Sequence, residues 1–251
     1  MLCSKAFAIA FGILTLIIPR ETVVAAELPI NPAAEGQDVI WGKKVVEGGY
    51  ILHFRHANRE KWIDVTAFDA IELLKNYEPD AVPFKRATCL SEQGVHEAQL
   101  MGSVFEAARV QLETIISSPS CRSRQTAQHA FGRIDMISNS LLHRTAIPAR
   151  QHLAFNTALR KLILNSQPTR GKNTILSGHA GTLRLDSGIV IDRNETGEGL
   201  DERDETGFVV LEVVGDQIIA RHKFRSIMYF AHDMLELPVT RDDERITENA
   251  D

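Results

Sequence analysis

The chain of 251 residues is 44% hydrophobic and 24% charged, which is the composition of a globular protein with room for one large α/β domain or two small ones. Its net charge of −5 gives no electrostatic case for nucleic acid as a partner. Any site that binds an anion must therefore be a local positive pocket in a mildly acidic body.

The first 26 residues have the pattern of a secretory signal peptide. Lys5 precedes an apolar run at 6–18, and Val24-Ala25-Ala26 offers a small-residue cleavage site. The run is short for a spanning helix, although an uncleaved anchor stays open as an alternative. We expect residues 1–26 to be removed and residues 27–251 to form a secreted or periplasmic domain without a stable membrane span.

The most informative stretch comes early in the mature chain. Residues 39–47 predict a short helix, and residues 50–54 then predict a buried strand of a parallel sheet. Arg55, His56 and Arg59 follow at the carboxyl end of that strand, where open α/β sheets bind their ligands. Two guanidinium groups beside an imidazole can hold a dianion and leave a ring nitrogen to react with it.

Residues 60–88 carry no motif. A helix is predicted at 67–76, and Pro79 and Pro83 interrupt the residues after it. Because residues 60–88 come directly after the Arg-His loop, we expect them to form an insertion that covers the pocket.

A second strand-to-helix unit resembles the first. Ser91 begins a predicted helix with an apolar stripe that includes Met101 and Phe105. Residues 114–117 then predict a buried strand that leads into a basic loop at 118–124 and a helix. Arg122 would lie where a helix N-terminus adds positive potential for an anion.

The late part of the chain predicts a third such unit. Residues 132–155 are ambiguous, and residues 156–165 predict a helix. Residues 174–177 predict a third buried strand, after which His179 reaches the same edge of the sheet as His56. A β-hairpin is predicted from 208–214 and 217–224, and the acidic end after Asp242 is expected to be frayed.

Four motifs in order resemble the histidine phosphatase superfamily, also called the phosphoglycerate mutase-like family. The Arg-His-Gly motif of the family is similar to Arg55-His56-Ala57, and its Leu-Ser/Thr-x-x-Gly helix start is similar to residues 90–94. Its Ser-Ser-Pro-x-x-Arg-x-x-x-Thr-Ala motif matches residues 117–127 without a gap, and its late Gly-His matches residues 178–179. The resemblance implies a three-layer α/β/α sandwich with a mostly parallel central sheet.

The resemblance also implies an activity and a set of roles. His56 would be the nucleophile that forms a phosphohistidine, and Arg55 and His179 would take part in catalysis. Arg59 and Arg122 would bind the phosphate of the substrate. The implied reaction is hydrolysis of a small-molecule or envelope phosphomonoester, and neither a cofactor nor a metal is implied.

Two departures from the family pattern raise questions. Ala57 stands where the family usually has Gly, so the loop must tolerate a methyl group. Many members have a Glu between the arginine motif and the late histidine as general acid, but residues 136–185 contain no Asp or Glu. Other members have an acid directly after the late histidine, where this chain has Ala180. The remaining candidates are Glu60, Asp64, Glu202 and Glu205.

The missing acid leaves two alternatives open. The first is a protein that binds phosphate esters without turning them over. The second is a phosphohistidine-protein phosphatase, whose imidazole leaving group departs readily.

The sequence also predicts a disulfide and structural or surface roles for the remaining histidines. Cys89 and Cys121 remain after export, and an even pair in an oxidising compartment favours a disulfide over two buried thiols. His53 alternates away from the pocket and is interpreted as a packed core histidine. The other histidines, His143 among them, are interpreted as structural or surface residues.

Overall fold

The computed structural model describes residues 32–60, 82–183, 191–192, 200–201 and 204–235. The expected signal peptide at 1–26, the helix at 67–76, most of the insertion at 60–88 and the chain end after Asp242 lie outside these residues.

One sheet organises the described residues. Its strand order is β3-β2-β4-β1-β6-β7-β5. Pairing is parallel from β1 to β4, from β4 to β2 and from β2 to β3, whereas β6 runs antiparallel to both β1 and β7. The strands are β1 (Ile51–Arg55), β2 (Leu112–Ser117), β3 (Met136–Ile137), β4 (Asn173–Gly178), β5 (Ile191–Asp192), β6 (Phe208–Val214) and β7 (Gln217–Phe224).

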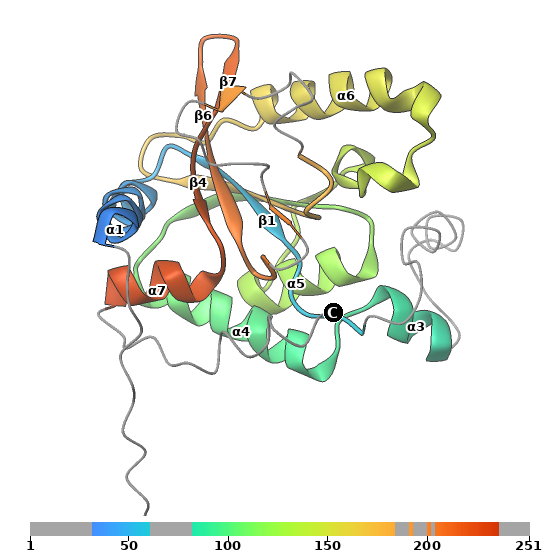
Figure 1. The fold of residues 1–251 in the computed structure, drawn as a ribbon, viewed down its shortest axis with the longest axis horizontal. Helices are drawn as coiled ribbons and strands as arrows, with labels where there is room; N and C mark the ends of the chain where they lie inside the picture. Colours follow the sequence, from blue (N-terminus) through green and yellow to red (C-terminus); the bar gives the residue numbers. More distant parts are fainter. Residues whose placement is uncertain (1–31, 61–81, 184–190, 193–199, 202–203, 236–251) are drawn as a thin grey trace, which may run out of the picture.

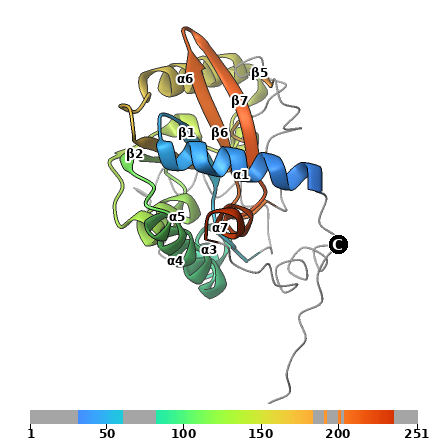
Figure 2. The same ribbon diagram turned by 90° about the vertical axis from the view of Figure 1, so that its left-hand side faces the viewer.

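Helices cover both faces of this sheet, so the fold has three layers (Figures 1 and 2). One layer consists of α1 (Pro32–Glu47), α4 (Glu92–Ala107), α5 (Cys121–Phe131) and α7 (Ile227–Leu235). The other contains α6 (His152–Asn165) and a segment of short 3₁₀ turns at Asn139–Leu141, Arg144–Ala146 and Ala149–Gln151. The α/β class, the three layers and the mostly parallel sheet predicted from the sequence are confirmed.

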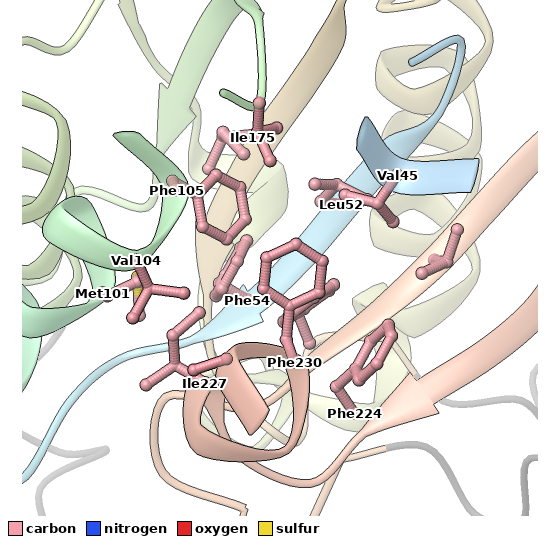
Figure 3. Close-up of a cluster of buried hydrophobic side chains, with 14 of the residues drawn as sticks. Val45, Leu52, Phe54, Met101, Val104, Phe105, Ile175, Phe224, Ile227 and Phe230 are labelled. Carbon is pink, nitrogen blue, oxygen red and sulfur yellow. The ribbon is translucent and has the colours of Figure 1, made fainter. Parts of the chain in front are cut away.

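Two apolar clusters join the layers. Leu52 and Phe54 of β1 pack against Phe105 and Phe230 on the face covered by α4 and α7 (Figure 3). Ile51 points to the opposite face and joins the cluster of α6. Because both faces of β1 are buried, three of its five residues are apolar, which is why the strand could be predicted.

Helix boundaries differ from the sequence predictions in several places. α1 begins at Pro32 instead of residue 39, and α6 begins at His152 instead of residue 156. Neither α3 (Val82–Thr88) nor α7 was predicted. Pro83 does not prevent α3, because it lies in the first turn, where the missing N–H of proline breaks no helical hydrogen bond.

Candidate active site

His56 and His179 lie side by side at the carboxyl edge of the sheet. β1 and β4 are parallel neighbours with Arg55 opposite Gly178, and the backbone N–H of His56 donates to the carbonyl of Gly178 at 3.2 Å. The two imidazole centroids are 5.4 Å apart, and both side chains are buried. Strand pairing therefore brings together two histidines that are more than a hundred positions apart in sequence.

The ring of His56 has one nitrogen fixed by the backbone. Its Nδ1 lies 2.8 Å from the carbonyl oxygen of Ala57. Since a carbonyl only accepts, Nδ1 carries the proton and the lone pair of the neutral ring is on Nε2. Burial, followed by the charges of Arg122 and Arg55, lowers the pKa of His56 well below its ordinary value. At neutral pH the ring is therefore uncharged.

Ala57 joins the first motif to the arginine motif. Its side chain is fully buried, and its backbone N–H donates to Oγ1 of Thr126 at 3.0 Å. Thr126 also donates to the carbonyl of Arg122, one turn earlier in α5. The methyl group that departs from the family pattern is therefore accommodated next to the threonine of the arginine motif.

Arg122 lies in the first turn of α5 and is buried, with 2% of its surface exposed. Its positive charge acts on both histidines, because after burial it is the largest cause that lowers the pKa of His56 and of His179. The preceding Cys121 forms a disulfide with Cys89, and their Cα atoms are 4.8 Å apart. The predicted disulfide is therefore present, and it ties the N-terminus of α5 to the segment before α4.

His179 is held by serines of the arginine motif. Its Nε2 lies 3.1 Å from Oγ of Ser118 and 3.5 Å from Oγ of Ser123. Its Nδ1 is buried and has no hydrogen-bond partner among the described residues. A buried polar atom of this kind calls for a ligand or water, and a bound oxyanion would satisfy it. Burial, followed by Arg122 and His56, lowers the pKa of the His179 ring.

Arg55 is buried and already engaged by the late acidic loop. Its Nη1 donates to the carbonyl of Asp201 at 2.8 Å, and its Nη2 forms an ion pair with Glu205 at 3.3 Å. Asn58 donates to the other oxygen of Glu205 at 2.8 Å. Glu205 thus reaches the predicted site, but it holds the first motif in place instead of standing apart as an acid.

Arg59, the third predicted guanidinium, contacts the backbone of the next residue. Its Nη1 donates to the carbonyl of Glu60 at 3.0 Å, and its charge is the weakest of the three guanidiniums acting on the pKa of His56. Of the other candidate acids, Glu60 accepts from the exposed Arg86 at 2.7 Å. Asp64 and Glu202 lie outside the described residues.

Sequence reasoning missed Glu97. Its carboxylate accepts from the backbone N–H of Asn58 and from Nε2 of Gln93, both at 2.8 Å. Burial raises its pKa. Its place on α4, three residues after Gly94 of the helix-start motif, was the signal that could have pointed to it. Glu97 fixes the loop that carries His56.

No three His, Cys, Asp or Glu side chains in the described part of the chain are grouped so that they could hold a metal ion. The helices within the described ranges include none with the length and apolar character needed to cross a membrane.

Comparison with known proteins gives similarity at the level of structure. No family model and no curated protein matches the sequence. The protein histidine phosphatase SixA, solved with tungstate, is 13% identical with a TM-score of 0.46, over 71% of this chain and 97% of that one. A phosphoserine phosphatase mutant from Entamoeba histolytica, solved with phosphoserine, is 11% identical with a TM-score of 0.43, over 72% and 98%. YhfR from Bacillus stearothermophilus is 14% identical with a TM-score of 0.45, over 73% and 100%.

Proposed function

We propose that the chain is a histidine phosphatase that hydrolyses a phosphomonoester through a phosphohistidine on Nε2 of His56. The observation that carries the proposal is the buried ring of His56, which is fixed through Nδ1 on Ala57 and lies 5.4 Å from the ring of His179. Arg55 and Arg122 are the buried cations whose charge acts on this ring. A neutral nucleophile among fixed positive charges is what transfer of a phosphoryl dianion requires.

The reaction proceeds in two steps. Nε2 of His56 attacks phosphorus in line, the P–N bond forms, and the P–O bond to the alcohol breaks. Arg122, Arg55 and the Nδ1 edge of His179 stabilise the equatorial oxygens. Water then attacks the phosphohistidine, the P–N bond breaks, and the electron pair returns to Nε2. The products are the alcohol and inorganic phosphate.

We also propose that the enzyme works outside the cytosol. The signal-peptide pattern of residues 1–26 supports export, and so does the Cys89–Cys121 disulfide, because disulfides persist in oxidising compartments. The substrate would then be a phosphomonoester of the cell envelope or its surroundings.

Trapping of the intermediate tests the proposal. The full-length protein and a His56→Ala variant are incubated with a ³²P-labelled aryl phosphate and quenched in base, in which phosphohistidine survives. We expect label on the peptide that contains His56 in the wild type only. An exposed histidine of α5, His129, supplies the control variant His129→Ala, which should label normally. Full turnover by His56→Ala would contradict the nucleophile assignment.

A second reaction at the same site is hydrolysis of phosphohistidine in a protein. This reaction is favoured because Glu205 pairs with Arg55 and Glu97 accepts from Asn58, so both carboxylates are already engaged in structural contacts. An imidazole leaving group needs little help from a general acid. A phosphohistidine-containing protein offered beside an alkyl phosphate distinguishes the two substrates. Binding of phosphate or vanadate with turnover of neither would favour a protein that only binds phosphate esters.

A further inference from the structure

The peptide group between Ala57 and Asn58 is hydrogen-bonded on both sides. Its carbonyl oxygen accepts from Nδ1 of His56 at 2.8 Å. Its N–H donates to Oε2 of Glu97, also at 2.8 Å. Because a trans peptide group is planar, with its C=O and N–H pointing in opposite directions, it joins the carboxylate on one side to the imidazole on the other.

Helix α4 holds both ends of the Asn58 contact. Oε1 of Glu97 accepts from Nε2 of Gln93, one turn earlier in the helix, at 2.8 Å. Ser91, the N-cap of α4, donates through Oγ to Oδ1 of Asn58 at 2.7 Å and through its backbone N–H to the carbonyl of Asn58 at 3.2 Å. The start of α4 therefore fixes Asn58 through its N–H, its C=O and its side-chain amide.

The carboxylate differs from the acceptors of the two preceding N–H groups. The backbone N–H groups of His56 and Ala57 donate to neutral acceptors, a carbonyl and a hydroxyl. That of Asn58 donates to a carboxylate, and hydrogen bonds to ionised groups are about twice as strong as neutral ones. Hydrogen bonds in a chain polarise one another, so this contact makes the Ala57 carbonyl a better acceptor for Nδ1–H.

Attack on phosphorus changes the charge of the His56 ring. Nε2 gives its electron pair to phosphorus while Nδ1 keeps its proton, so positive charge spreads over the ring. The charges of Arg122 and Arg55 oppose a positive ring, which is why they lower its pKa. The carboxylate of Glu97, joined to Nδ1 through one peptide group, supplies negative charge that offsets them.

We propose that Glu97 is a positioning residue for the nucleophile and acts on His56 through the Ala57–Asn58 peptide, an inference that rests on the proposed function. The hydrogen-bonded chain keeps the proton on Nδ1 and the lone pair on Nε2, and it stabilises the charge that develops on the ring. Loss of Glu97 should therefore slow formation of the phosphohistidine more than it weakens binding of the substrate.

Single-turnover kinetics of the full chain test this role. With enzyme in excess over 2,4-dinitrophenyl phosphate, release of dinitrophenolate reports the phosphorylation step, and this leaving group needs no acid. For Glu97→Ala we expect the rate constant to fall by about 10-fold or more, the factor associated with a hydrogen bond to a charged group. The enzyme concentration that gives half the maximal rate should change by less than about 3-fold, because Glu97 acts on the ring and not on the phosphate.

Two further variants separate the peptide contact from helix packing. Glu97→Gln keeps an acceptor for the N–H of Asn58 without the charge, so its rate constant should lie between those of the wild type and Glu97→Ala. Glu92→Ala removes an exposed carboxylate from the same helix and should change the rate by less than about 2-fold. Thermal unfolding checks that all three are folded. Equal losses in Glu97→Gln and Glu97→Ala, or in Glu92→Ala and Glu97→Ala, would overturn the assignment.

The Nδ1–H proton of His56 gives a readout that needs no turnover. In protein labelled with ¹⁵N-histidine, its NMR resonance is assigned by its absence from His56→Ala. A weaker hydrogen bond moves such a proton upfield, so we expect an upfield shift in Glu97→Ala and none in Glu92→Ala. A resonance at the wild-type position in Glu97→Ala would overturn the chain from carboxylate to ring.

Trapping of the intermediate separates this proposal from the one beneath it. Phosphohistidine that forms on His56 as fast in Glu97→Ala as in the wild type would overturn the role of Glu97 and leave the nucleophile standing. Absence of phosphohistidine from the wild type would overturn the proposed function, and the role of Glu97 with it.

Discussion

Oε1 of Glu205 lies 3.3 Å from Nη2 of Arg55, across 150 residues of sequence, and the two side chains are 14% and 5% exposed. Oε2 of the same carboxylate accepts from Asn58 at 2.8 Å. One side chain of the late acidic loop therefore holds two residues of the first motif. The position of the Arg55 guanidinium therefore depends on a part of the chain that the motifs do not cover.

Replacement of Glu205 by alanine should lower stability. Removal of one partner from a buried ion pair costs about 3–5 kcal/mol, and about 3 kcal/mol in a chain of this size lowers Tm by about 6–12 °C. Inorganic phosphate should raise the Tm of the variant more than that of the wild type, because it supplies the negative charge that Arg55 has lost. Thermal unfolding with and without phosphate measures both effects.

The control for this prediction is an exposed ion pair. Glu60→Ala removes the partner of Arg86 in a pair whose side chains are 37% and 58% exposed. Such pairs contribute about 0–1 kcal/mol, so Tm should change little. A Glu205→Ala protein that melts like the Glu60→Ala protein would contradict the role given to the buried pair.

Loss of the Cys89–Cys121 disulfide should destabilise the fold. The crosslink closes a loop with a sequence separation of 32, and chain-entropy arguments give about 3–4 kcal/mol for a loop of this length. Activity should also fall, because Cys121 directly precedes Arg122. Urea unfolding and phosphatase assays of the oxidised and reduced protein measure the two effects.

A double variant separates the crosslink from the reductant. Cys89→Ala/Cys121→Ala should match the reduced wild type in unfolding free energy, and reductant should not change it further. Two free thiols in the wild-type protein, found by mass spectrometry, would show that the crosslink does not form.

Buried strands were predictable because burial on both faces favours short apolar runs, such as Ile115-Ile116 in β2 and Ile175-Leu176 in β4. For β1, β2 and β4 the prediction therefore gave both the strand and its carboxyl end, and with the ends came His56, Arg122 and His179. Edge elements give no such signal. β3 has two exposed residues, and the turns before α6 depend on contacts with the loop of His179.

Sequence patterns could not predict the polar contacts of the site, for a different reason. Glu205 was one of several acidic residues in a loop, and nothing local indicates that it pairs with Arg55. His143 was interpreted as a structural or surface residue, since no periodicity or motif surrounds it. Both are placed by tertiary packing, and only a structure can show that Glu205 contacts Arg55 and that the ring of His143 lies beside that of His179.

Gly94 should resist substitution although it lies in a helix. A Cβ atom at this position would lie 2.0 Å from the carbonyl oxygen of Asn58, which also accepts from the backbone N–H of Ser91. Gly94→Ala must therefore push the first-motif loop away from α4. We expect a loss of stability of about 1–3 kcal/mol, as for overpacking in a core, and a fall in kcat/KM.

Gly36 provides a matched helical control. A Cβ atom there would meet nothing within 4 Å, so Gly36→Ala should stabilise the protein by about 0.5–1 kcal/mol through helix propensity. Urea unfolding of both variants gives the two values. A stabilising effect of the same sign at Gly94 would contradict the close contact with Asn58.

The last prediction concerns acid stability and His53. This residue of β1 is 1% exposed, both ring nitrogens are without a hydrogen-bond partner among the described residues, and burial lowers its pKa to about 4. The unfolded chain, with an ordinary histidine pKa near 6.5, binds more protons between these two values. The free energy of unfolding therefore falls as pH falls from about 6.5 to about 4.

The His53→Leu variant removes this contribution. The unfolding free energy of the variant minus that of the wild type should be about 2 kcal/mol larger at pH 5 than at pH 7. Burial lowers the pKa of His56 and His179 in both proteins, so the difference isolates His53. Urea unfolding at pH 7, 6 and 5 measures it, and parallel pH profiles for the two proteins would contradict a lowered pKa of His53 in the folded state.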